Sequence, residues 1–304
     1  MKHSLIALLI VVLGGCAALP SQPAAPGDAR LANLAGDYDN HAQVWQAREA
    51  KTVLPPVHVH HRIVAVGKSA EVWDWQLRMD RPQGAPLEVS WRYDARVLAD
   101  GRTLLTPARP LPVVKGGAAE FAPLAPCAMV GGIEHGVLTL ATDIAACSAI
   151  LPGLGAAGAL LPVRLRFDGH VLDVATFADQ PRGATASQHA VRARWFSGWV
   201  AINGAGPNAK ADSQDWHLHR DLALHDQGDV LPLRWRDGKP SGYSIRLEQL
   251  EYQQRDTRVL KLSLLRDADG DAVAYAWANP DASQIGLNLG WVQVGLRLGG
   301  GDRH

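Results

Sequence analysis

The chain has 304 residues, 47% of them hydrophobic, and its 30 basic and 30 acidic residues give a formal net charge of zero. This length and apolar content can bury the core of one large β domain or of two smaller ones. Because nucleic-acid binding depends on attraction between phosphates and basic side chains, a neutral chain without a basic run argues against a nucleic-acid partner.

The N-terminus is typical of a bacterial lipoprotein signal. A basic start precedes an apolar run, Ser4 to Leu13, that is too short to span a bilayer as a helix. Gly14 and Gly15 then lead into Cys16, as in a lipobox, whose cysteine is acylated and becomes the mature N-terminus. We therefore expect a signal peptide at residues 1–15 and palmitate-type acyl chains on Cys16 that bind a membrane. The alternative is an ordinary signal peptide with a chance cysteine.

No acidic residue follows the cysteine directly, since the next two residues are Ala17 and Ala18. We therefore expect a lipid anchor in the cell envelope, at the outer membrane and facing the periplasm. Residues 16–29 are rich in Ala and Pro and predict a lipidated linker. Apolar residues at helical spacing between Arg30 and Gln46 then predict one amphipathic helix.

Nearly everything after Pro55 and Pro56 predicts β-strands, which makes the fold mainly β and antiparallel. The expected strands are Val57–Val66, Glu71–Met79, Leu87–Leu98, Gly136–Ala141, Pro162–Phe167, Val171–Phe177, Val191–Ile202, Leu218–Leu224, Val230–Trp235, Tyr243–Tyr252, Val259–Leu265, Asp271–Trp277 and Trp291–Leu298. The glycine-rich apolar loop at Leu151–Leu160 is either a packed surface loop or a lip over a hydrophobic cavity.

A polar stretch after Pro207 predicts a boundary, with a barrel at residues 30–205 and a β-rich extension at residues 206–304. Whether the extension is a second module or completes the barrel stays open. Cys127 and Cys147 predict a disulfide in an oxidising envelope compartment, and unpaired buried thiols are the alternative.

Two His-x-His pairs, each with a further histidine nearby, are weak candidates for metal ligands: His58 and His60 with His61, and His217 and His219 with His225. Alternate residues of a strand share a face, so each pair can offer two imidazoles to one ion. The alternative is a set of exposed polar positions, because the sequence does not show that the two strands are neighbours. We assign no metal, cofactor or catalytic residue from the sequence.

Several separated patterns support one resemblance. The first is Leu31-x-x-Leu34-x-Gly36-x-Tyr38-x-Asn40-x-x-Gln43, and the later ones are Val72-Trp73, Leu124-x-x-Cys127 with Cys147, and Trp195 to Ile202. Over residues 30–205 the chain resembles the CpcT/CpeT family of chromophore lyases, which attach bilins to phycobiliproteins. The resemblance implies a lipocalin-like barrel whose cavity receives a hydrophobic tetrapyrrole, although an exported chain with a C-terminal extension departs from the cytosolic lyases.

The resemblance and the aromatic strand positions select candidate ligand-binding residues: Tyr38, Asn40, Trp73, Trp75, Trp91, Trp195 and Trp199. Ordinary core packing is the alternative for each of them. Trp73 and Trp75 should share a face of their strand, either inward or outward.

Three functions follow from these observations. The first is a lipid-anchored envelope protein that binds a hydrophobic or tetrapyrrole-like small molecule in its barrel. The second is a lyase-like enzyme, in which polar groups such as Glu71, Asp74 and Arg92 would converge inside a cavity. The third is a structural or assembly lipoprotein that has a filled barrel, binds no ligand and docks on a protein partner.

Overall fold

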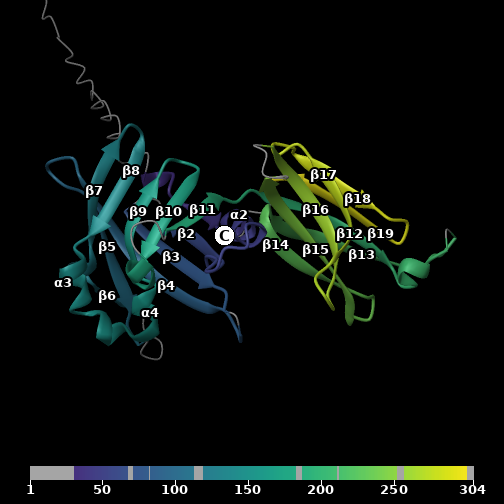
Figure 1. Ribbon diagram of the computed structural model, residues 1–304, viewed down its shortest axis with the longest axis horizontal. Coiled ribbons are helices and arrows are strands. Elements are labelled where there is room, and N and C mark those ends of the chain that lie inside the picture. Colours follow the sequence, from purple (N-terminus) through teal and green to yellow (C-terminus); the bar gives the residue numbers. More distant parts are fainter. Residues whose placement is uncertain are drawn as a thin grey trace, which may run out of the picture.

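The structure is a computed structural model that describes residues 31–67, 71–81, 83–112, 119–182, 187–210, 212–251 and 257–299. The expected signal peptide and the whole of the expected linker, including Cys16, lie outside these residues. The prediction of a mainly β fold is confirmed, with 56% strand and 14% helix. No helix in the described ranges has the length and apolar character needed to cross a membrane. Figure 1 shows two β units side by side.

Within the described residues, ten strands of the N-terminal unit form a closed antiparallel barrel, which is compatible with a lipocalin-like fold. The ring is closed by pairing of β4 (Leu87–Val97) with β5 (Thr103–Pro110). The barrel strands are β1 (Gly36–Asp39), β2 (Val59–Ala65), β3 (Val72–Met79), β4 (Leu87–Val97), β5 (Thr103–Pro110), β7 (Met129–Glu134), β8 (Val137–Thr142), β9 (Pro162–Phe167), β10 (Val171–Thr176) and β11 (Gln188–Arg192).

Short elements surround the barrel ends. Strand β6 (Phe121–Pro123) pairs with β5, and helix α2 (His41–Glu49) follows β1. The remaining short helices are η1 (Ala125–Cys127), α3 (Ile144–Ser148), η2 (Leu151–Leu154), α4 (Gly155–Ala159) and η3 (Phe177–Arg182). Cys127 of η1 and Cys147 of α3 form a disulfide, with their Cα atoms 4.5 Å apart, so the bridge ties two loops at one end of the barrel.

Inward-facing side chains fill the barrel. Because strand residues alternate between faces, Trp73 and Trp75 both point inward from β3, where they lie opposite Tyr93 and Trp91 of β4. Tyr38 enters the same core from β1. The barrel interior is therefore a packed aromatic and aliphatic core.

The expected helix between Arg30 and Gln46 is only partly correct. Gly36–Asp39 is strand β1, which pairs with β2 on one side and β11 on the other. Local spacing of apolar residues predicts a helix there, but two long-range strand pairings determine the conformation. Helix α2 starts only after Asn40, and the other helical residues described in this stretch are Leu31 and Ala32.

The C-terminal unit is a sandwich of two four-stranded antiparallel sheets around a second core. One sheet has the order β13-β12-β19-β18 and the other β14-β15-β16-β17. The elements are β12 (Trp195–Asn203), η4 (Gly206–Asn208), β13 (Trp216–His225), β14 (Gln227–Arg234), β15 (Pro240–Glu251), β16 (Arg258–Arg266), β17 (Ala272–Ala278), β18 (Gln284–Asn288) and β19 (Val292–Leu298).

The chain passes from barrel to sandwich between β11 and β12. The segment Val191–Ile202, expected as one strand, is divided between these two strands, which lie in different sheets. The change of sheet thus falls ahead of the expected boundary at residue 205. Trp195 to Ile202 pairs with β13 and β19 and does not close the barrel.

Candidate functional site

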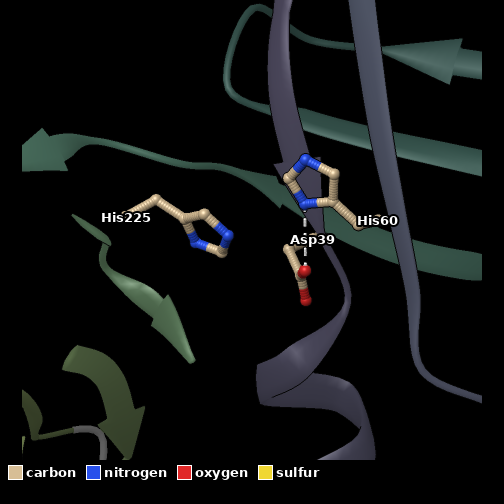
Figure 2. Close-up of side chains that lie close together, drawn as sticks. All are labelled: Asp39, His60 and His225. Carbon is tan, nitrogen blue, oxygen red and sulfur yellow. Dashed lines mark hydrogen bonds and ion pairs between the residues drawn. The ribbon is translucent and has the colours of Figure 1, made fainter. Parts of the chain in front are cut away.

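Ionisable side chains converge between the barrel wall and the sandwich. Strand β1, strand β2 and the residue just before β2 place four side chains on the outer face of the barrel: Asp37, Asp39, His58 and His60. Their neighbours Tyr38, Val59 and His61 take the inward positions. His225, at the end of β13, approaches this group from the sandwich (Figure 2). We call these five residues the junction cluster.

Asp39 is the centre of the junction cluster and is only 1% exposed. Its Oδ1 accepts hydrogen bonds from the backbone N–H of His41 and from His58 Nε2, both at 2.7 Å, and its Oδ2 lies 3.1 Å from His60 Nδ1. Burial alone would raise the pKa of Asp39, but the hydrogen bonds from the two histidines outweigh burial and hold this pKa well below its usual range.

Each of the barrel histidines lies between two carboxylates. His58 Nδ1 lies 2.8 Å from Asp80 Oδ2, and His60 Nε2 lies 3.2 Å from Asp37 Oδ1. A ring that donates from both nitrogens is an imidazolium. Burial lowers the pKa of His60, yet its hydrogen bonds to Asp37 and Asp39 raise it overall to about 9, so both geometry and electrostatics favour a charged ring in the metal-free protein.

His225 completes the junction cluster as a largely neutral group. Its ring stacks on that of His60, with centroids 5.1 Å apart, and the edge of Trp195 packs against it at 5.2 Å. Burial, together with the nearby charge of His60, lowers the pKa of His225. Trp195 also donates from Nε1 to Asp37 Oδ2 at 2.9 Å. One ligand atom from each of Asp39, His60 and His225 lies within 4.8 Å of the others.

The junction cluster opens on a cleft of about 700 Å³ whose walls come from both units. Two further contacts hold the units together beside it: His41 Nε2 lies 3.0 Å from the buried Glu248 Oε2, and Gln46 donates to Glu251 at 2.8 Å. Because charged side chains of the junction cluster line it, the cleft is polar, and it is open to solvent.

A second concave site, which we call the end groove, lies at the barrel end beside α2 and has a volume of about 630 Å³. Its apolar lining includes Ala47, Leu54, Val59, Met79 and Leu160. Leu160 comes from the end of the glycine-rich loop for which a cavity lip was one expectation, and it packs with Val59 in a small satellite core. Gln188 also lines the end groove, and its amide lies beside the buried ring of His61, to which it is hydrogen-bonded.

The candidate ligand-binding residues do not form one pocket. Tyr38, Trp73, Trp75 and Trp91 lie in the barrel core. Asn40 is buried and joins the start of α2 to β2, since its Oδ1 accepts from Val59 N at 2.7 Å and its Nδ2 donates to Val57 O at 2.9 Å.

The other two candidates belong to the sandwich, where Trp195 faces the junction cluster and Trp199 is 41% exposed. The polar groups proposed for an enzyme do not converge in the barrel interior either. Asp74 and Arg92 form an ion pair at 2.9 Å on the outer wall, and Glu71 is exposed.

The two His-x-His pairs also lie apart. His217 and His219 pack against each other on β13, opposite Ile202 and Val200 of β12. His225 lies six positions after His219, which corresponds to about 20 Å of strand. The sequence therefore indicated the right face for His58 and His60 but not their sandwich partner, His225, which only the packing of the two units brings near.

Barrel and sandwich together define a two-unit β protein with a polar junction cleft and an apolar end groove. No known protein family, curated protein or solved structure matches the chain. The barrel agrees with the lipocalin-like fold that the CpcT/CpeT resemblance implies, while no family match supports that assignment itself.

Proposed function

We propose that the chain is a lipid-anchored protein of the cell envelope that binds an amphipathic small molecule, lipid or tetrapyrrole-like, in the end groove. The anchor and the outer-membrane location rest on the lipobox-like Leu13-Gly14-Gly15-Cys16. Relative to the expectation from sequence, the binding site moves from the interior of the barrel to its end.

The end groove is the observation that carries this proposal. Its volume of about 630 Å³ falls in the range of small-molecule sites, which are typically lined by apolar side chains with a few polar groups. The barrel interior offers less support, because Trp73, Trp75 and Tyr93 are buried there in the hydrophobic core. Leu54, 76% exposed at the groove, presents apolar surface that a bound molecule would cover.

The lining also indicates the kind of ligand. Ala47, Met79 and Leu160 suit a hydrocarbon chain or the edge of an extended ring system. Polar groups also line the end groove, among them Asp179 and Ser187, and can accept hydrogen bonds from a ligand hydroxyl or N–H group. Both a lipid with a hydroxylated head and a tetrapyrrole with pyrrole N–H groups carry such donors.

A second candidate is the assembly lipoprotein without a small ligand, which the filled barrel favours. The edge strand β17 presents Val273, Tyr275 and Trp277 on one exposed face, a surface of the kind that protein partners cover. In this case the end groove would be a packing defect between α2 and the barrel.

Binding of two probes to the full chain tests the proposal: monooleoylglycerol for the lipid class and biliverdin for the tetrapyrrole class. Ala47→Trp, which fills the end groove from α2, should abolish binding of whichever probe the wild-type chain binds. Glu49→Trp places the same side chain at an exposed position on the same helix outside the groove lining and serves as the control.

If neither probe binds at micromolar concentration, or if Ala47→Trp binds as well as Glu49→Trp, small-molecule binding in the end groove is wrong. A protein partner recovered with the mature chain would then support assembly.

A further inference from the structure

We propose that Asp39, His60 and His225 form a binding site for one divalent first-row transition-metal ion, such as Zn²⁺, at the junction of the two units. This site is separate from the end groove and goes beyond the proposed function. One carboxylate oxygen and two imidazole nitrogens are a donor set that suits zinc and its neighbours in the first transition row. Figure 2 shows the three side chains directed toward a common point.

The spacing of the donor atoms is close to that of a metal site. Tetrahedral ligand atoms about 2.0–2.1 Å from zinc lie about 3.4 Å from one another. Asp39 Oδ2 and His60 Nδ1 are already 3.1 Å apart, in a hydrogen bond that a metal ion would replace with release of the Nδ1 proton. The widest separation in the set of three is at most 4.8 Å, so His225 is the ligand that must move inward, by about 1.4 Å at most.

The partners around the donors resemble the outer shell of a metal site. Metal-binding histidines usually donate their other ring nitrogen to a carboxylate, and His60 has Asp37 in that position at 3.2 Å. Asp37 is itself fixed by Trp195. Oδ1 of Asp39 accepts hydrogen bonds from His58 and from the backbone N–H of His41. Oδ2 is therefore the oxygen directed at His60.

Burial and access are both suitable. Asp39 is 1% exposed and His225 is 8% exposed, so an ion would be shielded from solvent on the side of the barrel wall. The cleft of about 700 Å³ lies on the other side and gives room for a water molecule as a fourth ligand. Three protein ligands with one open position differ from the four ligands of a closed structural zinc site.

The ligands come from two units that are far apart in sequence. Asp39 and His60 belong to β1 and β2 of the barrel, and His225 belongs to β13 of the sandwich. A bound ion would therefore add a bond between the units beside the contact of His41 with Glu248. Metal binding should stabilise the arrangement of barrel and sandwich, because an ion that binds only the assembled site favours that state.

The test is a titration of the full chain, stripped with a chelator and exchanged into metal-free buffer, with Zn²⁺ by calorimetry and with Co²⁺ by visible absorption. We expect one ion per chain. His225→Gln and His60→Gln should each weaken binding by roughly 100-fold or more, since even changes to outer partners cost about 10–100-fold. Circular dichroism establishes that both variants are folded.

His217→Gln and His219→Gln are matched controls, because they remove histidines from half-buried positions on the same sandwich strand, far from the junction cluster. Their affinity should equal that of the wild type. X-ray absorption of the zinc-loaded wild type gives a readout without mutation, namely two imidazole ligands and oxygen ligands at about 2.0–2.1 Å.

Absence of binding at micromolar Zn²⁺, or equal affinity in His225→Gln and His217→Gln, would overturn the metal site and leave the junction cluster as a network of ion pairs. Ala47→Trp in the end groove should leave zinc affinity unchanged. The metal site and the proposed small-molecule function can therefore fail independently.

Discussion

Adjacent histidines on one strand, His60 and His61, show how differently the two faces of the barrel wall are built. Alternation along β2 directs His60 toward the sandwich and His61 into the barrel core. Hydrogen bonds to Asp37 and Asp39 overcome burial and raise the pKa of His60 to about 9. Burial, with the nearby charge of His60, lowers the pKa of His61 to about 3. The same side chain is thus charged on one face and neutral on the other.

The contrast indicates two different sources of stability. Inside the barrel, packing of large apolar side chains dominates, and even the polar ring of His61 serves mainly as an acceptor for Trp75 Nε1 at 3.2 Å. At the junction, buried carboxylates are balanced by imidazolium and guanidinium groups, as in the 2.6 Å contact of Arg194 with the buried Asp226. Truncation of a side chain should therefore lower the free energy of unfolding most inside the barrel. A change of pH should alter the free energy of unfolding through His60 on one face and His61 on the other.

The largest effect is expected from Trp75→Ala in the barrel core. The substitution leaves a cavity and removes the hydrogen-bond donor for His61, so the free energy of unfolding should fall by about 4 kcal/mol. Urea denaturation followed by circular dichroism measures this change. Trp199→Ala, at an exposed position, is the control and should cost less than about 1 kcal/mol. Equal losses in the two variants would contradict the description of the barrel as a packed core.

A smaller but still large decrease in the free energy of unfolding is expected from Asp39→Ala at the junction. His58 and His60 would lose their shared carboxylate while they remain largely buried, which costs about 3 kcal/mol for a broken buried ion pair. Asp80, the other partner of His58, has a side chain that is 49% exposed, so Asp80→Ala should cost less than about 1 kcal/mol. Denaturation in the presence of a chelator separates this effect from metal binding. A loss below that of Asp80→Ala would show that the junction cluster does not stabilise the fold.

The sequence predicted more of the fold than of the candidate site because strand patterns are local and the site is not. Alternation placed Trp73 and Trp75 on one face and likewise placed His58 and His60 together. Strand β1 was missed because its four residues fit helical spacing and become extended only through pairing with β2 and β11. The passage between units was missed because only Ala193 and Arg194 separate β11 from β12, without a linker-like composition.

The titration of the two adjacent histidines should differ in the metal-free protein. The stabilising contribution of His60 is fully present below its unfolded pKa of about 6.5 and is lost as pH rises through about 9. His61 acts in the opposite sense, because the unfolded chain takes up a proton below pH of about 6.5 while the folded one does not until about 3. Stability should therefore fall on both sides of neutral to mildly acidic pH.

NMR spectra of the imidazole groups, recorded with a chelator present, measure these two pKa values directly. The His61 resonances should stay constant between pH 5 and pH 8, and those of His60 should remain in the charged form over the same range. His61→Gln should remove part of the acid sensitivity of the free energy of unfolding. Titration of both rings near pH 6.5 would remove the contrast between the two faces.

The smallest effects are expected from two buried tyrosines whose hydroxyl groups differ in hydrogen bonding. Tyr38 donates to Leu34 O at 2.9 Å and also contacts Arg192, whereas the buried hydroxyl of Tyr93 has no partner among the residues that the structure describes. Tyr38→Phe should lower the free energy of unfolding by about 1 kcal/mol, and Tyr93→Phe should leave it unchanged or raise it by up to about 1 kcal/mol, because an unpaired buried hydroxyl is itself unfavourable. Thermal and urea denaturation of the two variants side by side give the sign. A loss in Tyr93→Phe as large as in Tyr38→Phe would mean that the Tyr93 hydroxyl has a partner, such as an ordered water, inside the barrel, and the interior would then be a polar, hydrated site as well as an apolar core.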